Sequence, residues 1–199
     1  MRLTPATLSQ NLLSVSSFSG LDWSTLVTAI SNAVAIWVNT PSNITLLGTA
    51  TGVITGSGEV RGTLIAPPLP NFAQVASSAS GLTGAVAFEM YGAIGIACSI
   101  SMTGISYLGT SPVVHTGSDS SKVVSVNQPA LSELLTNTIR STFLSTGGTP
   151  QVNQSLLSVG ISVALAQQIF LATGTGVVTP RVVASTPSGG ASPTFSTIG

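Results

Sequence analysis

The sequence predicts an α+β fold made of three tandem units, each with a short helix, a longer apolar helix and a Gly/Thr-rich β-hairpin. Three observations predict this fold class: an internal repeat, apolar residues at helical spacing, and β-branched runs bounded by glycine, proline and serine. Apolar residues make up 43% of the 199-residue chain, which is enough to form a hydrophobic core.

The repeat sets the expected boundaries of the units. The pattern Leu-Gly-Thr, five residues, Thr-Gly-Ser occurs at Leu47–Ser57 and again, 61 residues later, at Leu108–Ser118. A looser third copy begins at Thr173. We therefore expect repeat units at 1–68, 69–129 and a shortened 130–184, followed by an extended C-terminal tail at 185–199.

The long helices follow from the spacing of apolar residues. In the first unit, residues 23–38 carry one apolar face, Asp22 is the expected N-cap, and Pro41 ends the helix. The corresponding segment of the second unit, 84–100, is apolar on all sides. The third, 155–170, is intermediate.

Prolines and β-branched runs mark the remaining elements. Short helices are expected after Pro70 and Pro129, where NFAQVASSAS and ALSELLTNTIRSTF begin. Strands are expected at ITLL, GVIT, EVRGTLI and KVVSV, which are bounded by Gly, Pro and Ser.

The glycine-rich stretch Leu47–Gly62 invites comparison with phosphate-binding loops. Its segment Gly56–Gly62 is one residue too long for the dinucleotide fingerprint, and no lysine follows the glycines as a P-loop requires. A strand-like run follows where a helix is needed, so the glycines are expected at hairpin turns. Glu59 and Arg61 share one strand face and are candidate interface residues, pairing in solvent or across an interface.

The charge content is far below that of an ordinary soluble domain. Charged residues are 5% of the chain against roughly 25% on average, and the net charge is zero. This excludes electrostatic steering of nucleic acid. Because near-zero net charge promotes association, we expect the surface to be covered by copies of the chain, by partners or by lipid. The Pro/Gly/Ser-rich tail is expected to lie on a neighbouring molecule.

The residues with catalytic potential do not form a catalytic pattern. His115 and Asp119 lie within five residues on one predicted turn, whereas Ser-His-Asp triads assemble from separated elements. The single cysteine, Cys98, excludes an intramolecular disulfide and falls in the most apolar helix. The sequence therefore predicts no catalytic, cofactor or metal site and no small-molecule substrate. His115 and Asp119 are instead candidate interface residues.

Glu89 is the one carboxylate inside an apolar run. In an oligomer it is expected to face a polar seam or pair with an arginine of another subunit; in a membrane it would be an ion or proton site. The run Leu82–Met102 is long enough to span a bilayer. Neither end carries a flanking Lys or Arg, and the corresponding helix of the first unit is amphipathic, so membrane association is the alternative interpretation.

The low charge, the abundance of Gly, Ser, Thr, Ala and Val, and the tandem helix-plus-hairpin units resemble the small structural virion proteins of tailed bacteriophages. The resemblance is one of composition and repeat style over the whole chain, and its best fit is to neck, tail and baseplate components. It implies a multi-copy, non-enzymatic building block of a ring or lattice, with copies of itself and other virion proteins as partners. It also implies localisation in the virion after assembly in the host cytoplasm. The alternatives are a membrane-associated protein using the 82–102 helix and a secreted surface or adhesin module.

Overall fold

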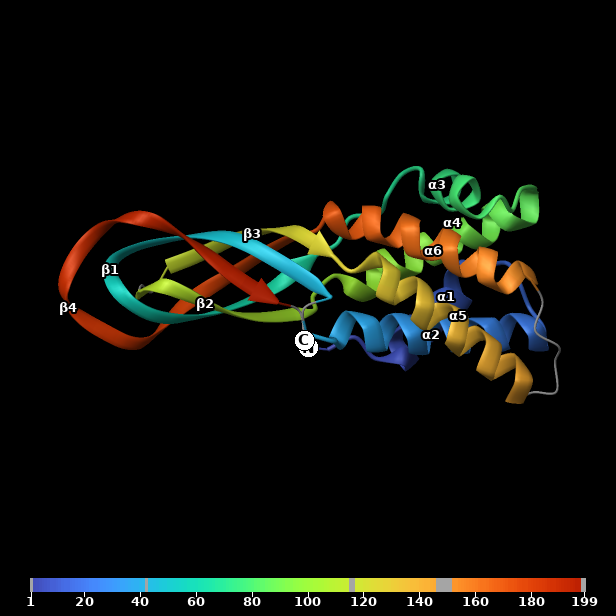
Figure 1. The fold of residues 1–199 in the computed structure, drawn as a ribbon, viewed down its shortest axis with the longest axis horizontal. Helices are drawn as coiled ribbons and strands as arrows, with labels where there is room; N and C mark the ends of the chain where they lie inside the picture. The colour runs from blue at the N-terminus through green and yellow to red at the C-terminus, as the bar shows by residue number, and fades with distance from the viewer. Residues whose placement is uncertain (1, 42, 115–116, 146–151, 198–199) are drawn as a thin grey trace.

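The computed structural model is elongated, with helices at one end and strands at the other (Figure 1). It describes residues 2–41, 43–114, 117–145 and 152–197, and the side chains of 49–58, 110–119, 152 and 178–197 lie outside this description. In order, the elements are α1 (Pro5–Val15), α2 (Leu21–Asn39), β1 (Ile44–Ile65), α3 (Phe72–Ser80), α4 (Ala85–Met102), β2 (Ser106–Val114), β3 (Gly117–Val126), α5 (Gln128–Ser145), α6 (Val152–Phe170) and β4 (Thr173–Thr197). The predicted α+β fold class is confirmed.

Local sequence signals explain several helix ends. Thr4 caps α1, since its hydroxyl accepts a hydrogen bond from the backbone N–H of Thr7 at 3.1 Å and Pro5 occupies the first turn. The start of α2 differs from the prediction: the N-cap is Gly20, with φ of 103°, and Asp22 lies in the first turn. In this position the Asp22 carboxylate interacts favourably with the positive end of the helix dipole, although it does not cap the helix.

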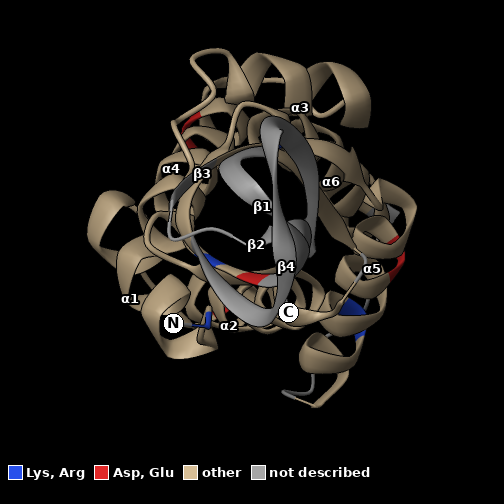
Figure 2. Cartoon of the chain, turned by 90° about the vertical axis from the view of Figure 1, so that its left-hand side faces the viewer, with Lys and Arg blue, Asp and Glu red and all other residues tan. Residues whose placement is uncertain are grey.

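The six described helices form a ring. Three pairs are consecutive in the chain, α1 with α2, α3 with α4 and α5 with α6. The longer helices also pack against a neighbouring pair: α2 against α5, α6 against α3, and α4 against α1. Figure 2 looks along the molecule from the strand end and shows these helices surrounding the axis of the barrel. Each pair is therefore held on both sides by the other two.

The strands close into one antiparallel barrel. β1 and β4 each leave the helices, bend at the far end of the molecule and return (Figure 1). Residues 44–50 of β1 pair with β3 on one side, and residues 45–52 pair with the final part of β4 on the other. The returning half of β1 pairs with β2 and with the first part of β4. The outgoing and returning halves of β1 are thus each flanked by strands from elsewhere in the chain.

β4 completes the closure. Its first residues, 173–178, pair with β3, and its last, 195–197, pair with β2. The strand order around the barrel is β1-β2-β4-β3, with β1 and β4 paired along most of their lengths. At the end of the barrel near the helices, each described strand segment pairs with a neighbouring segment on both sides. Barrel closure of this kind removes the exposed strand edges that promote aggregation.

The barrel is narrow, and glycines make room for one aromatic ring. Tyr107 of β2 is buried, with 3% of its surface exposed. A Cβ at Gly174 would lie 2.6 Å from Cε1 of Tyr107, and a Cβ at Gly62 would clash with the end of the same ring. These positions are glycine because the tyrosine ring occupies the space of their side chains.

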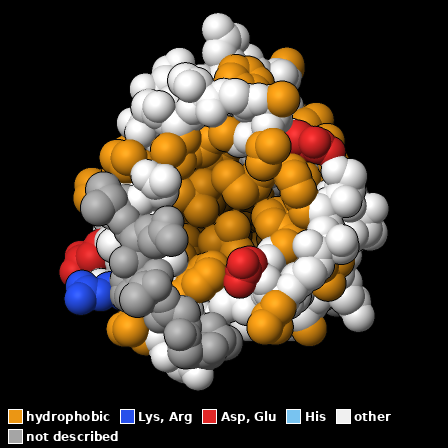
Figure 3. Space-filling model, turned by 90° about the vertical axis from the view of Figure 1, so that its right-hand side faces the viewer, with side chains coloured by type: hydrophobic (Ala, Val, Ile, Leu, Met, Phe, Trp, Pro, Cys, Tyr) orange, Lys and Arg blue, Asp and Glu red, His pale blue; other side chains and the backbone are white. Residues whose placement is uncertain are grey.

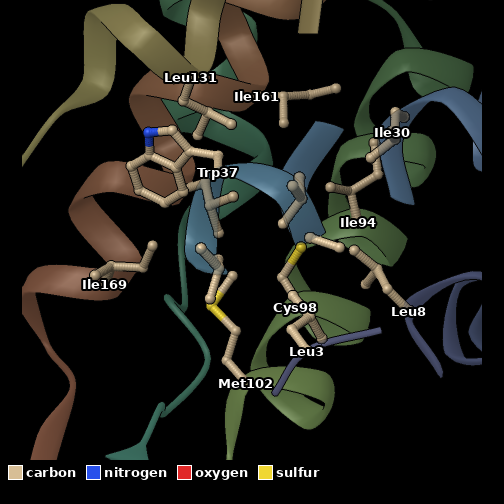
Figure 4. Packing of buried hydrophobic residues seen from close by; sticks show 14 of the residues in the cluster. Leu3, Leu8, Ile30, Trp37, Ile94, Cys98, Met102, Leu131, Ile161 and Ile169 are labelled. Carbon is tan, nitrogen blue, oxygen red and sulfur yellow. The ribbon is translucent and has the colours of Figure 1, made fainter. Parts of the chain in front are cut away.

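The hydrophobic core runs through the helical half and into the base of the barrel. Figure 4 shows Trp37 among aliphatic side chains from α5 and α6, with Cys98 and Met102 of α4 in the same cluster. The indole N–H of Trp37 donates to the carbonyl of Asn127 at 2.9 Å, which ties the end of α2 to the start of α5. The core therefore joins segments that are far apart in sequence.

Two further expectations differ from the structure. The segment expected as a tail continues β4 through Thr197, and its residues 190–197 pair with β1 inside the same chain. The expectation of a short first helix is wrong for α5, which has 18 residues, as many as α4.

Candidate interaction surface

Two of the candidate interface residues form a pair on the barrel. Arg61 donates to the carboxylate of Glu59 on the returning half of β1, as their spacing predicted. The Arg61 side chain is 69% exposed and that of Glu59 is 15% exposed. Such an exposed pair stabilises the fold by roughly 0–1 kcal/mol, so its position at the surface matters more than its energy.

Arg61 also borders a shallow hollow where the barrel meets the helices. The hollow is lined by Arg2, Arg61, Gly62, Thr63, Ser106, Tyr107 and Leu108. It brings two of the five basic residues of the chain to one side of the barrel base. The arrangement offers charge and hydroxyl groups to a neighbour, and its two cations come from segments 59 residues apart.

Glu89 is exposed at the far end of the helical half. It lies near the start of α4, and its Oε1 accepts a hydrogen bond from the hydroxyl of Ser17 in the link between α1 and α2. The apolar run around Glu89 therefore does not bury the carboxylate. The hydrogen bond orients the charge at the end of the molecule farthest from the barrel.

The remaining candidates fall partly or wholly outside the description. His115 is not among the described residues, and of Asp119 only the backbone is described, in β3 opposite Ala50 and Gly176. The structure thus brings Glu59 and Arg61 together and places Glu89 in the other half of the molecule. The candidates do not converge on one site within the described part.

Cys98 sits in the core with no measurable exposure. Burial raises the pKa of its thiol to about 12, because the charged thiolate is disfavoured away from water. The protonated thiol is a poor nucleophile and metal ligand. Throughout the described ranges, no group of three or more His, Cys, Asp or Glu residues is placed to hold a metal ion.

An apolar surface that the sequence did not predict lies at the helical end. The ends of α1, α3 and α5 and the starts of α2, α4 and α6 lie there (Figure 1). We call it the apolar end face and define it by seven exposed side chains: Leu13, Leu21, Val86, Phe88, Leu144, Leu156 and Val159. Figure 3 shows that apolar side chains line a hollow in the middle of this end, with acidic side chains at its border.

The hollow follows from the construction of the helix ring. At one end the barrel covers the middle of the ring, whereas at the other end no described strand or helix lies across it. The helices starting at Leu21, Ala85 and Val152 bring apolar side chains to this opening. The sequence signal for this surface is the presence of apolar residues in the first turns of these helices, outside the core-facing side. The periodicity of residues 23–38 or 84–100 does not distinguish such exposed apolar residues from core residues.

Two helices also satisfy the length and apolarity needed to cross a membrane. They are α2 and α4, and 61% and 50% of their most apolar windows are buried inside the protein. Core helices of soluble proteins pass the same test, so this observation weighs little by itself. Exposed Ile96 and Ile100 do give α4 an apolar outer side.

No protein-family model, no curated protein and no solved structure matches this chain. Support for a function therefore comes from the fold, the charge distribution and the surfaces described above.

Proposed function

We propose that this chain is a non-enzymatic structural component of a tailed-bacteriophage virion, placed in the neck, tail or baseplate. The observation that carries the proposal is the arrangement of three helix pairs and their strands about one axis. A subunit that binds a symmetric ring can make similar contacts with each copy in the ring if its own surfaces repeat around an axis.

We further propose that the chain consists of three equivalent units that exchange strands. The element order supports this: two helices precede β1, two precede β2 and β3, and two precede β4. The helix ring supports it too, because α2, α4 and α6 each pack on the first helix of another pair. Within the barrel, Leu46, Tyr107 and Gly174 occupy corresponding positions, since each lies on an outgoing strand between returning segments of the other units.

Such a chain suits a position on, or in a ring around, an axis of threefold or sixfold symmetry. Its contacts would be made by the barrel surface and the apolar end face, with other virion proteins and copies of the chain as partners. The surface is poor in charge, 5% of residues, which suits a protein that remains packed in an assembly. Catalytic machinery has no part in this role.

The proposal is tested by locating the protein in purified particles. Mass spectrometry with cross-linking should find the chain in intact virions, linked to neck, tail or baseplate proteins, and particle reconstruction should show it near a symmetry axis. Recovery only in the membrane fraction or the culture medium of infected cells would contradict the proposal.

Membrane association is the second candidate because α2 and α4 are long and apolar and α4 exposes Ile96 and Ile100. It predicts that the purified chain partitions with phosphatidylcholine vesicles in flotation. Substituting both isoleucines by serine should abolish that flotation if α4 meets lipid. The virion proposal predicts no flotation of either form.

A further inference from the structure

We propose that the apolar end face binds a convex apolar segment of a protein partner whose flanks carry lysine or arginine. This site is argued from the surface itself and does not depend on where the chain is used. Its parts are the exposed apolar side chains, the shape of the hollow and the charges near it.

The apolar side chains come from all three helix pairs. Leu13 and Leu21 belong to the first pair, Val86 and Phe88 to the second, and Leu144 to the third. Leu21 and Val86 are 74% and 67% exposed. A monomeric soluble protein rarely leaves so many large apolar side chains together in water, so this group marks a contact surface.

The shape argues for a convex occupant. Figure 3 shows a hollow with apolar walls. Two copies meeting face to face through the same hollow would enclose an empty apolar space, and its walls would gain few contacts. A protruding apolar segment fills the space and gains those contacts. A second copy docked through this face is therefore a poor fit.

The charges argue for a basic flank. The described helices carry four charged residues, of which Asp22 and Glu89 lie near the starts of α2 and α4 at this end. On α5, Arg140 is exposed five residues from the helix end that reaches this face, and Glu133 lies closer to the barrel, so two acids and one base leave the face with a net negative charge. Both acids are exposed, and Glu89 is oriented by the hydroxyl of Ser17. Lysine or arginine beside the inserted segment would complement them, whereas anionic lipid or an acidic partner would be repelled.

The test uses two synthetic peptides with the same helical Leu/Ala centre. One carries two lysines at each end and the other carries two glutamates. With a fluorescent label and the full-length chain, anisotropy should show the lysine-flanked peptide binding about tenfold more tightly at low salt. The difference should shrink as salt screens the charges. In Asp22→Asn/Glu89→Gln, the preference for the lysine-flanked peptide should be lost.

Two variants on α4 locate the site. Val86→Asp places a charge in the apolar contact, at a first-turn position where the helix dipole accepts it. Measured at high salt, where attraction between the new carboxylate and the lysines is screened, it should weaken binding of the lysine-flanked peptide about tenfold or more. Ile100→Asp is the matched control, because Ile100 is 52% exposed on the same helix but near its opposite end. It should leave peptide binding unchanged. Circular dichroism checks that both variants retain the helices.

Several outcomes would overturn the proposal. One is equal binding of both peptides, and another is equal binding by the wild type and Val86→Asp. A concentration-dependent dimer in sedimentation velocity that Val86→Asp disrupts would assign the face to a second copy. Flotation with phosphatidylcholine/phosphatidylglycerol vesicles that Val86→Asp abolishes would assign it to lipid.

Discussion

Ser121 donates a hydrogen bond to the hydroxyl of Tyr107 across the inside of the barrel, over 3.0 Å. The two residues belong to β3 and β2, which are not neighbours in the described strand order. The bond therefore crosses the interior and does not follow a strand pair. Around it, Gly62 and Gly174 leave space for the ring, so the tyrosine fits inside the base of the barrel.

Removing the tyrosine hydroxyl should cost about 1 kcal/mol of unfolding free energy, the net value of one buried hydrogen bond. The change is Tyr107→Phe, and the measurement is equilibrium unfolding in urea. Ser120→Ala is the control, because Ser120 is an exposed neighbour of Ser121 on the same strand. An equal effect of the two substitutions would show that the bond across the barrel does not stabilise the fold.

Gly174→Ala should destabilise by about 1–3 kcal/mol, since the new methyl group would lie 2.5 Å from the Ser121 hydroxyl oxygen and 2.6 Å from the Tyr107 ring. The same substitution in a Tyr107→Leu background should cost less, because leucine leaves more room beside residue 174. A double-mutant cycle measured in urea gives the coupling, expected at about 0.5–3 kcal/mol. If the two substitutions had independent effects, the Tyr107 ring would not be the reason that residue 174 is glycine.

Gly160→Ala should separate α3 from α6. A Cβ at Gly160 would lie 2.6 Å from the carbonyl oxygen of Ala76 and 2.7 Å from the hydroxyl of Tyr91, so backbone must move, at a cost of about 1–3 kcal/mol. Gly92→Ala is a close control, since Gly92 is also helical and nothing lies within 4 Å of its Cβ position. That variant should be neutral or more stable by up to about 1 kcal/mol, through helix propensity. Thermal unfolding of the two variants should shift in opposite directions or only for Gly160.

Stability should fall in alkaline solution because of Cys98. The thiol has an ordinary pKa of 9.0, and burial raises its pKa in the folded protein to about 12. Between these values the unfolded chain loses the proton while the folded chain keeps it, so the stability present below pH 9 declines by at most about 1.4 kcal/mol per pH unit up to pH 12. Cys98→Ala should flatten this decline in urea titrations from pH 8 to 11. A residual slope is expected from Tyr91, whose pKa burial also raises.

Separating the third helix pair and β4 from the rest should leave two unfolded fragments. Residues 128–199 expressed alone lack every strand that pairs with β4, and residues 1–127 lose the partner of β1 along most of its length. Co-expression should recover a one-to-one complex with native circular dichroism. Cooperative thermal unfolding of 1–127 by itself would contradict the exchange of strands that joins the pieces.

Much of the fold could be predicted from local sequence. The apolar spacing of residues 23–38 predicted most of α2, and the β-branched run KVVSV predicted much of β3. The Leu-Gly-Thr pattern at Leu47 and Leu108 falls in β1 and β2, where strands were expected. These signals are carried by neighbouring residues, which is why they can be read without the structure.

What could not be predicted depends on distant partners. The Pro/Gly/Ser composition of 185–197 is typical of a mobile tail, yet its pairing partner is β1, more than 130 residues earlier. The apolar end face could not be predicted for a related reason. Val86 has the spacing of a core residue, and its exposure depends on how the helices are arranged in the ring. Composition describes a segment, whereas pairing and exposure depend on the remainder of the chain.

The closure of the barrel by β4 has a consequence for synthesis. Of the four described strands β4 leaves the ribosome last, and until it does, β1, β2 and β3 lack neighbours on one side. The nascent chain therefore carries open strand edges until β4 has been synthesised, and such edges pair readily with other chains. A ribosome that stops before β4 is complete releases a product unable to cover those edges, so premature termination at that point yields an aggregating protein.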